Sequence, residues 1–153
     1  MEMHHNIKQL KPSKSARYQQ GYLDINCCKK YFPQLKNDKI IYRSSYERKF
    51  MMWLENCKNV KYWGSECFYI PYYCVLDQKT HHYYPDYFIE FNDGKHVVVE
   101  IKPLNQTIQP KNKNSYAYQT YIKNVCKWEA MKEFCKSKGY EFKILTENTI
   151  NKL

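Results

Sequence analysis

The chain has 153 residues, which suits one domain with a single buried core. Its 25 lysines and arginines against 15 acidic residues give a formal net charge of +10. Together with 16 tyrosines, this favours nucleic acid as a partner, because basic side chains bind phosphates and aromatic rings stack on bases. No apolar run approaches the roughly 20 residues of a membrane span, and the first residues lack the apolar core of a signal peptide. Composition therefore argues against a membrane or secreted protein.

The cysteine pattern favours free thiols. Seven cysteines, an odd number, are typical of a reducing cytoplasm rather than of a disulfide framework. No C-x-x-C pair is present, although a zinc site built from Cys67, Cys74, His81 and His82 remains an alternative. Buried thiols and exposed imidazoles are the favoured interpretation.

Residues 1–39 are polar and basic and show no sustained periodicity. They predict a mobile or loosely docked arm that precedes a folded domain over residues 40–153. The arm is either simply solvated or a tail that contacts phosphates. Its basic residues include Lys8, Lys11, Lys14 and Arg17.

The stretch "YRSSYERKFMMWLENC" predicts the first helix. Ser44 fits the N-cap and Glu47 falls at the third helical position, which makes an S-x-x-E capping box. The expected buried face follows helical spacing and comprises Tyr46, Phe50, Trp53, Leu54 and Cys57.

Strands are expected next. Residues 60–76 are aromatic and β-branched and read as strand material, while "YYPDYFIEF" and "KHVVVEIK" are two strands joined by the tight turn "NDG". Residues 103–115 then predict a loop.

A long helix is expected over residues 116–138, with Gly139 as its C-terminal cap. Its expected buried face comprises Tyr121, Val125, Trp128, Met131 and Cys135. "YEFKILT" predicts the last strand, and "ENTINKL" a final helical turn. The order helix, three strands, helix, strand predicts an α/β fold with a mixed central sheet flanked by helices.

One group of charged residues stands out in these strands. Strand alternation places Glu100 and Lys102 on one face, and the hairpin brings Asp86, 14 positions before Glu100, towards them. Two nearby carboxylates repel each other unless a divalent cation lies between them, and Mg²⁺ prefers such oxygen ligands. Lys102 is then expected to orient or activate an attacking water and to offset charge on the phosphorus. The alternative is an exposed strand end with a Glu–Lys pair worth at most about 1 kcal/mol.

Glu47 has two possible roles. As a capping-box residue it needs no further function, yet its place at the edge of the buried helix face also allows its carboxylate to face the sheet. The residues alone leave this choice open.

The motif "YPD…VVVEIK" resembles the signature of PD-(D/E)XK nucleases. The motifs "YRSSYE", "WL", "YWGSE", "IPYY", "EIKP", "KWEA" and "FKILTE" follow the same order as in the head-completion nucleases of tailed phages, which are similar to TnsA-type transposon endonucleases. The resemblance covers about residues 40–148. It departs from the family in a longer basic arm and in Leu104 and Asn105, where lysines often follow "EIKP".

The resemblance implies a restriction-endonuclease-like core of order α-β-β-β-α-β and a Mg²⁺ site, with Mn²⁺ as a substitute. It implies that the metal ligands are Asp86, Glu100, the carbonyl of Ile101, and Glu47. It also implies that Glu47, Asp86, Glu100 and Lys102 are catalytic and that Arg43, Lys123 and Lys127 are candidates for DNA binding. For Lys127 the alternative is a solvated surface lysine. Glu66 is either a further polar neighbour of the site or a residue of strand entry.

The implied function is a Mg²⁺-dependent DNA endonuclease that processes packaged DNA or its end before tail attachment. Its expected partners are double-stranded or branched DNA and portal or neck proteins, with no membrane. Its expected location is the host-cell cytoplasm or the head or neck of the virion. The alternatives are a junction, repair or transposition nuclease with the same site, and a non-cleaving structural neck protein that kept the fold.

Overall fold

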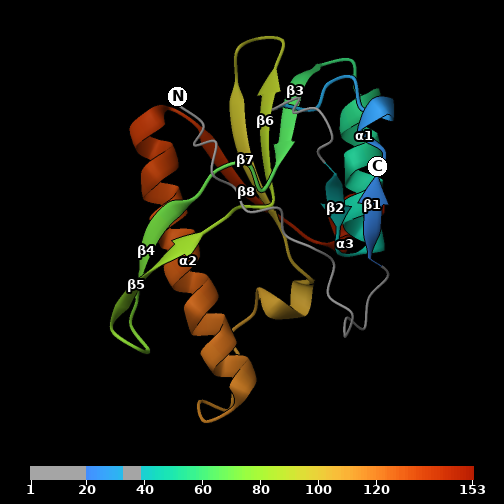
Figure 1. Cartoon of the computed structure of the whole chain (residues 1–153). Coiled ribbons are helices and arrows are strands. Elements are labelled where there is room, and N and C mark those ends of the chain that lie inside the picture. Colours follow the sequence, from blue (N-terminus) through green and yellow to red (C-terminus); the bar gives the residue numbers. More distant parts are fainter. Residues whose placement is uncertain (1–19, 33–38) are drawn as a thin grey trace.

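A four-stranded mixed sheet forms the centre of the protein in the computed structural model, which describes residues 20–32 and 39–153. Its spatial order is β3-β6-β7-β8, with β3 antiparallel to β6, β6 antiparallel to β7, and β7 parallel to β8 (Figure 1). The strands are β3 (Val60–Ser65), β6 (Tyr87–Phe91), β7 (His96–Ile101) and β8 (Glu141–Leu145). The expected α/β fold with a mixed sheet flanked by helices is confirmed.

Alternation along the strands divides the core into two apolar clusters. Val97 and Val99 of β7 join the cluster on the side of α1 (Ser45–Asn56), whereas Val98 joins the cluster on the side of α2 (Tyr116–Lys138). Figure 1 shows the two long helices on opposite sides of the sheet. The sheet is therefore the middle layer of three, and each face is buried by apolar side chains.

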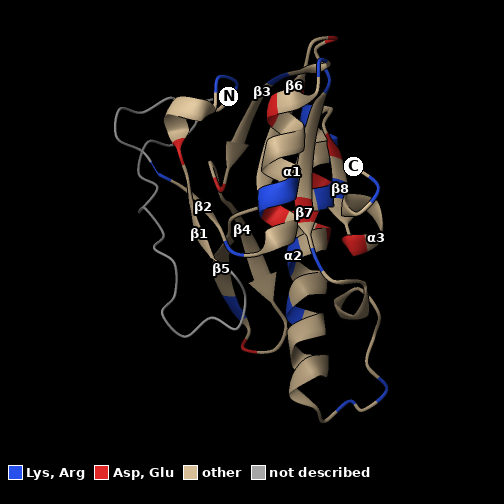
Figure 2. Ribbon diagram, turned by 90° about the vertical axis from the view of Figure 1, so that its right-hand side faces the viewer, with Lys and Arg blue, Asp and Glu red and all other residues tan. Residues whose placement is uncertain are grey.

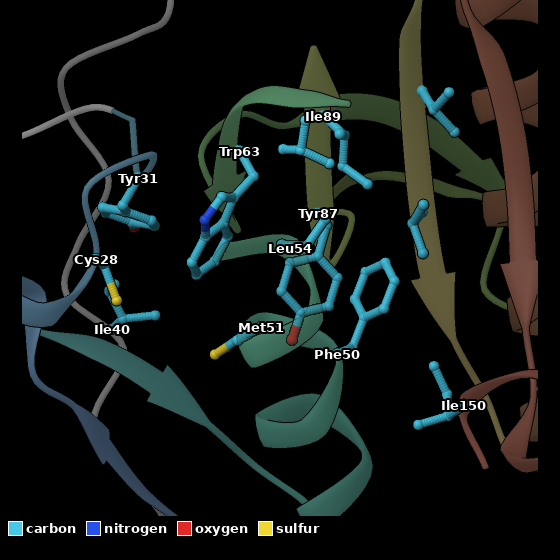
Figure 3. Packing of buried hydrophobic residues seen from close by; sticks show 13 residues of the cluster. Cys28, Tyr31, Ile40, Phe50, Met51, Leu54, Trp63, Tyr87, Ile89 and Ile150 are labelled. Atoms are coloured by element: carbon cyan, nitrogen blue, oxygen red, sulfur yellow. The ribbon is translucent and has the colours of Figure 1, made fainter. Parts of the chain in front are cut away.

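The first cluster joins α1 to the sheet. Phe50, Met51 and Leu54 of α1 lie against the rings of Trp63 and Tyr87 (Figure 3). Phe50 meets Tyr87 edge to face, with ring centroids 5.0 Å apart. The periodicity of the helix identified Phe50 and Leu54 correctly. It missed Met51, which is fully buried, and included Tyr46, which is largely exposed.

An additional hairpin, inserted in the chain between β3 and β6, is the main departure from the expected layout. The stretch expected as one run of strand bends after β3, where Glu66 has a positive φ of 47°. Strand β4 (Ile70–Cys74) then pairs with β5 (Lys79–Tyr83), and within the described ranges the two form a separate two-stranded sheet. The sequence of β5, "KTHHY", is polar, so no strand was predicted there. Such a sequence is possible because β5 completes a hairpin rather than the buried central sheet. This hairpin packs on α2 (Figure 1).

The expected arm over residues 1–39 lies partly outside the described residues, which omit 1–19 and 33–38. Its described part, 20–32, is docked rather than loose. Strand β1 (Gly21–Leu23) pairs with β2 (Ile40–Tyr42), and the short helix η1 (Ile25–Cys27) follows. Cys28 and Tyr31 are buried in the first cluster, where Tyr31 meets the Trp63 ring at 4.9 Å. Burial of these apolar groups explains why the segment docks.

Helix α2 starts at the N-cap Ser115 and ends at Gly139, whose φ of 71° confirms the left-handed cap. Its buried residues are Asn124, Trp128, Met131 and Cys135, whereas Tyr121 and Val125 are only half-buried. The helix η2 (Leu104–Gln106) interrupts the loop before α2, and α3 (Glu147–Ile150) is the expected final turn, with Ile150 buried. Within the described residues, no helix has the length and apolarity to cross a membrane.

Candidate active site

Glu100 is a buried carboxylate near the end of β7, with only 4% of its surface exposed. One of its oxygens, Oε2, accepts a hydrogen bond of 2.8 Å from the Tyr83 hydroxyl. The other, Oε1, lies 3.2 Å from the Lys102 ammonium. The expected Glu–Lys pair on one face is thus present, and it is largely buried, which contradicts the alternative of an exposed strand end. A buried carboxylate is tolerated because both oxygens have partners.

Asp86 lies beside the same strand end. Its Oδ2 accepts a 2.7 Å hydrogen bond from the main-chain N–H of Ile101, the residue after Glu100. The hairpin pairing of β6 with β7 sets this position, since Tyr87 stands opposite Val99. Burial, followed by the charges of Glu100 and Glu47, holds the pKa of Asp86 well above its ordinary value. The three carboxylates therefore form one electrostatic group.

Glu47 reaches this group from the first turn of α1. The Ser44 hydroxyl accepts from the Glu47 N–H at 3.1 Å, as the N-cap prediction requires. The Glu47 carboxylate, however, accepts from the N–H of Arg43 at 2.6 Å rather than from that of Ser44. Burial raises the pKa of Glu47, and the Glu66 charge adds to it, against the opposing hydrogen bond from Arg43. Glu47 thus supports the helix start while its charge acts on Asp86.

Lys102 carries a positive charge into the group. Burial alone would lower the pKa of Lys102, but the charges of Glu100 and Asp86 outweigh it and the net shift is upward. Lys102 is therefore an ammonium at neutral pH, which donates hydrogen bonds and offsets negative charge.

Two of the DNA-binding candidates, Lys123 and Lys127, lie on α2. Lys127 on α2 stands over the rings of Tyr72 and Tyr83, at 5.8 and 5.6 Å from their centroids. Burial, then the charge of Lys102, lowers the pKa of Lys127, which places it near the site. Lys123 is exposed one turn earlier on α2.

A cleft of about 290 Å³ opens next to the group. Its lining includes Glu47, Ile101, Lys102 and Arg43, whereas Asp86 and Glu100 are not among the lining residues. Arg43 also pairs with Glu66, with Nε 3.5 Å from Oε1, so Glu66 is a polar neighbour of the site. Figure 2 shows acidic and basic residues interspersed along α1, so this side of the site carries both signs of charge.

The donor set fits a divalent cation. Each of the three carboxylates offers hard oxygen ligands. Burial, and after it the charges of Glu100 and Glu47, raises the pKa of Asp86, and a divalent cation would offset these negative charges. Within residues 20–32 and 39–153, however, no group of three or more His, Cys, Asp or Glu side chains is arranged so that it could hold a metal ion by itself. A cation here would therefore also depend on other oxygens, such as main-chain carbonyls, water and substrate phosphate. The role of the Ile101 carbonyl stays a prediction.

The residues of the alternative zinc site are used otherwise. Cys67 and Cys74 are buried in the second apolar cluster, as free thiols. His81 pairs with Asp77 at 2.7 Å, and His82 stacks on Tyr69 with ring centroids 4.3 Å apart. The zinc site has no support in this arrangement.

Tyr83 is the site residue that sequence reasoning missed. Charge and strand alternation point to carboxylates and lysines and give no reason to choose one tyrosine among 16. The available signal was position, since Tyr83 precedes Asp86 by three residues in "YYPD" and so enters the site with it.

The mixed sheet, the buried Glu-x-Lys pair and the neighbouring aspartate together define a PD-(D/E)XK-like nuclease. Comparison with known proteins agrees. Residues 57–147 match the family model described as "TnsA-like endonuclease N terminal", a span that contains Asp86, Glu100 and Lys102 but not Glu47. The head completion nuclease of Enterobacteria phage T4 is 32% identical over 125 residues, which are 75% of this chain and 83% of that protein. The chain belongs to the TnsA-like endonuclease family and is related to the phage head completion nuclease.

Proposed function

We propose that the protein is a Mg²⁺-dependent endonuclease that hydrolyses phosphodiester bonds of DNA. The observation that carries the proposal is the buried Glu100 carboxylate, held between Tyr83 and Lys102 with Asp86 alongside. A protein has little reason to keep several carboxylates together in a half-buried group unless their charge is used, because their repulsion costs stability.

The proposed substrate is double-stranded or branched DNA. The net charge of +10 supports this, because phosphate contacts supply most of the affinity for nucleic acid. Arg43 lines the cleft and Lys127 lies beside the site. These two side chains, with Lys123 one turn earlier on α2, are the proposed contacts to the DNA backbone.

In this proposal the chain's residues orient and stabilise the reacting phosphate. When bound, Mg²⁺, or Mn²⁺ in its place, supplies Lewis acidity and lowers the pKa of a bound water. Asp86, Glu100, Glu47 and the Ile101 carbonyl are the groups that would hold it. The Lys102 ammonium, at the cleft, donates to a non-bridging phosphate oxygen and offsets the charge that develops in the transition state.

The proposed biological role is phage head completion, in which packaged DNA or its end is processed before tail attachment. The relationship to the T4 head completion nuclease supports this role. The protein would then act in the host-cell cytoplasm or at the head or neck of the virion, next to portal or neck proteins. The family match favours one second candidate, a transposition- or junction-type nuclease that uses the same site.

The test is incubation of the purified protein with linear, branched and single-stranded DNA, in Mg²⁺, in Mn²⁺ or in chelator. We expect cleavage of linear duplex, alone or together with branched DNA, in either metal and no cleavage in chelator. Cleavage of branched DNA alone would favour the second candidate. Cleavage that persists in chelator, or no cleavage of any substrate, would contradict the proposed enzyme.

A further inference from the structure

The Glu100 carboxylate has two partners, Lys102 and Tyr83, which come from different parts of the chain and differ in rigidity. Lys102 comes directly after β7 and reaches Oε1 through a long flexible side chain. Tyr83 comes from the end of β5 and reaches Oε2 with a hydroxyl on a rigid ring. The ring is fixed by burial, since Tyr83 is only 3% exposed, and by an edge-to-face contact with Tyr72 at 6.5 Å.

The two partners also differ in what else they are needed for. Lys102 lines the cleft, so its ammonium can leave Glu100 for a substrate phosphate. The Tyr83 hydroxyl is buried and has Glu100 as its partner. When Lys102 turns to substrate, Tyr83 is the group that still determines the orientation of the Glu100 carboxylate.

We propose that Tyr83 is a positioning residue of the active site, whose hydroxyl fixes the Glu100 carboxylate in the orientation that receives a divalent cation. The inference rests on the proposed function, and it assigns the hairpin β4–β5 a part in the site. Hydrogen-bond partners behind a metal-ligating carboxylate hold it in place, and their loss typically costs about 10–100-fold in metal affinity or activity.

A purely structural role for Tyr83 makes a different prediction. A buried carboxylate needs hydrogen-bond partners for stability alone, and leaving one unmade costs about 1–3 kcal/mol whatever the site does. Loss of stability therefore does not distinguish the two roles. Metal affinity measured on folded, DNA-free protein does, because a structural role leaves it unchanged.

The experiment compares Tyr83→Phe with Tyr72→Phe. Both changes remove one hydroxyl from a buried tyrosine of the same hairpin that lies under Lys127, but within the described residues only the Tyr83 hydroxyl bonds to Glu100. Binding of Mg²⁺ and Mn²⁺ is measured by calorimetry on full-length protein, at a temperature where circular dichroism shows each variant folded. We expect Tyr83→Phe to raise the metal Kd about 10-fold or more and Tyr72→Phe to leave it unchanged.

Cleavage adds a second readout. The Mg²⁺ concentration for half-maximal cleavage should rise with Tyr83→Phe, and saturating Mg²⁺ should restore most of kcat. Equal metal Kd values for wild type and Tyr83→Phe would overturn the inference while leaving the proposed function intact, as would an equal loss in both variants. A wild-type protein that binds no divalent cation would overturn the proposed function itself, and this inference with it.

Discussion

Asp86, Glu100 and Glu47 are three carboxylates at one strand end, and their charges oppose one another through a poorly hydrated environment. Burial and these neighbours raise the pKa of Asp86, which means that its ionised form is energetically disfavoured in the metal-free protein. Among the residues that the structure describes, Lys102 is the one that brings a compensating full charge into contact with Glu100. At the residue scale, the three carboxylates destabilise the metal-free protein but provide negative charge for a bound cation.

The cost of ionising Asp86 in the folded protein predicts that Asp86→Asn stabilises the metal-free protein at neutral pH. A carboxyl whose folded pKa is raised stabilises the fold below its ordinary pKa of about 3.9 and loses that contribution as the pH rises through the folded value. Asparagine never ionises, and its carbonyl oxygen still accepts from the Ile101 N–H. In chelator, the variant should therefore melt at a higher temperature than wild type at pH 7, and the difference should shrink towards pH 4.

Thermal melts at several pH values, with chelator throughout, measure this difference. Cleavage should be lost in the same variant. A variant that melts below wild type at neutral pH would show that the negative charge of Asp86 stabilises the fold, contrary to this account.

At the element scale, the predictable parts are those that repeat. The alternation of β7 assigned Val97 and Val99 to one face and Glu100 to the other, and the S-x-x-E motif located the start of α1. The hairpin β4–β5 and the docking of residues 20–32 could not be predicted, because each depends on contacts with α2 or Trp63 that are far away in sequence. Tyr83 was missed for the same reason. Its partner Glu100 is 17 residues away in the sequence, and a tyrosine by itself does not indicate a catalytic site.

The start of α1 is where helix stability and site charge can be separated. Glutamine at position 47 can still accept from the Arg43 N–H, but it supplies no charge to a cation. Glu47→Gln should leave the melting temperature nearly unchanged or slightly raised, because the carboxylate is already partly destabilised by burial. Cleavage should fall at least about 10-fold, which corresponds to about 1.4 kcal/mol of barrier.

Ser44→Ala is the contrasting variant, since it removes the N-cap hydroxyl and leaves the charge. It should cost roughly 0.5–2 kcal/mol of stability. Melting curves and cleavage rates over a range of Mg²⁺ concentrations distinguish the two roles of Glu47. Added Mg²⁺ should restore part of the cleavage activity that Glu47→Gln loses. A Glu47→Gln protein that melts early but cleaves normally would leave Glu47 as a helix-start residue alone.

At the scale of the whole molecule, binding and chemistry are carried by different sets of residues. The net charge of +10 results from 25 basic and 15 acidic residues distributed along the chain, whereas the proposed chemistry lies in a single group between α1, the hairpin and the sheet. Affinity for DNA should therefore fall steeply with salt, because phosphate contacts release counterions.

Lys102→Ala tests this division of roles. The variant should keep most of the wild-type DNA affinity and its salt slope, since one lysine adds little to the general field. Its turnover should be lost. Binding is measured by fluorescence anisotropy over a salt series in chelator, and cleavage in Mg²⁺ on the same preparations. If affinity and cleavage fall in parallel, Lys102 anchors the DNA and takes no part in the chemistry.

The central claim is that the buried carboxylate at the end of β7 is used for cleavage, and the most direct measurement is DNA cleavage in Mg²⁺ by Glu100→Gln. This change keeps the shape of the side chain and an acceptor for Tyr83 while removing the charge. Glu90→Gln is the matched control, on the neighbouring strand β6, where Glu90 pairs with the exposed Lys61. With both variants folded by circular dichroism, the account predicts cleavage at the wild-type rate for Glu90→Gln and none for Glu100→Gln. Cleavage by a folded Glu100→Gln protein at the wild-type rate would contradict it.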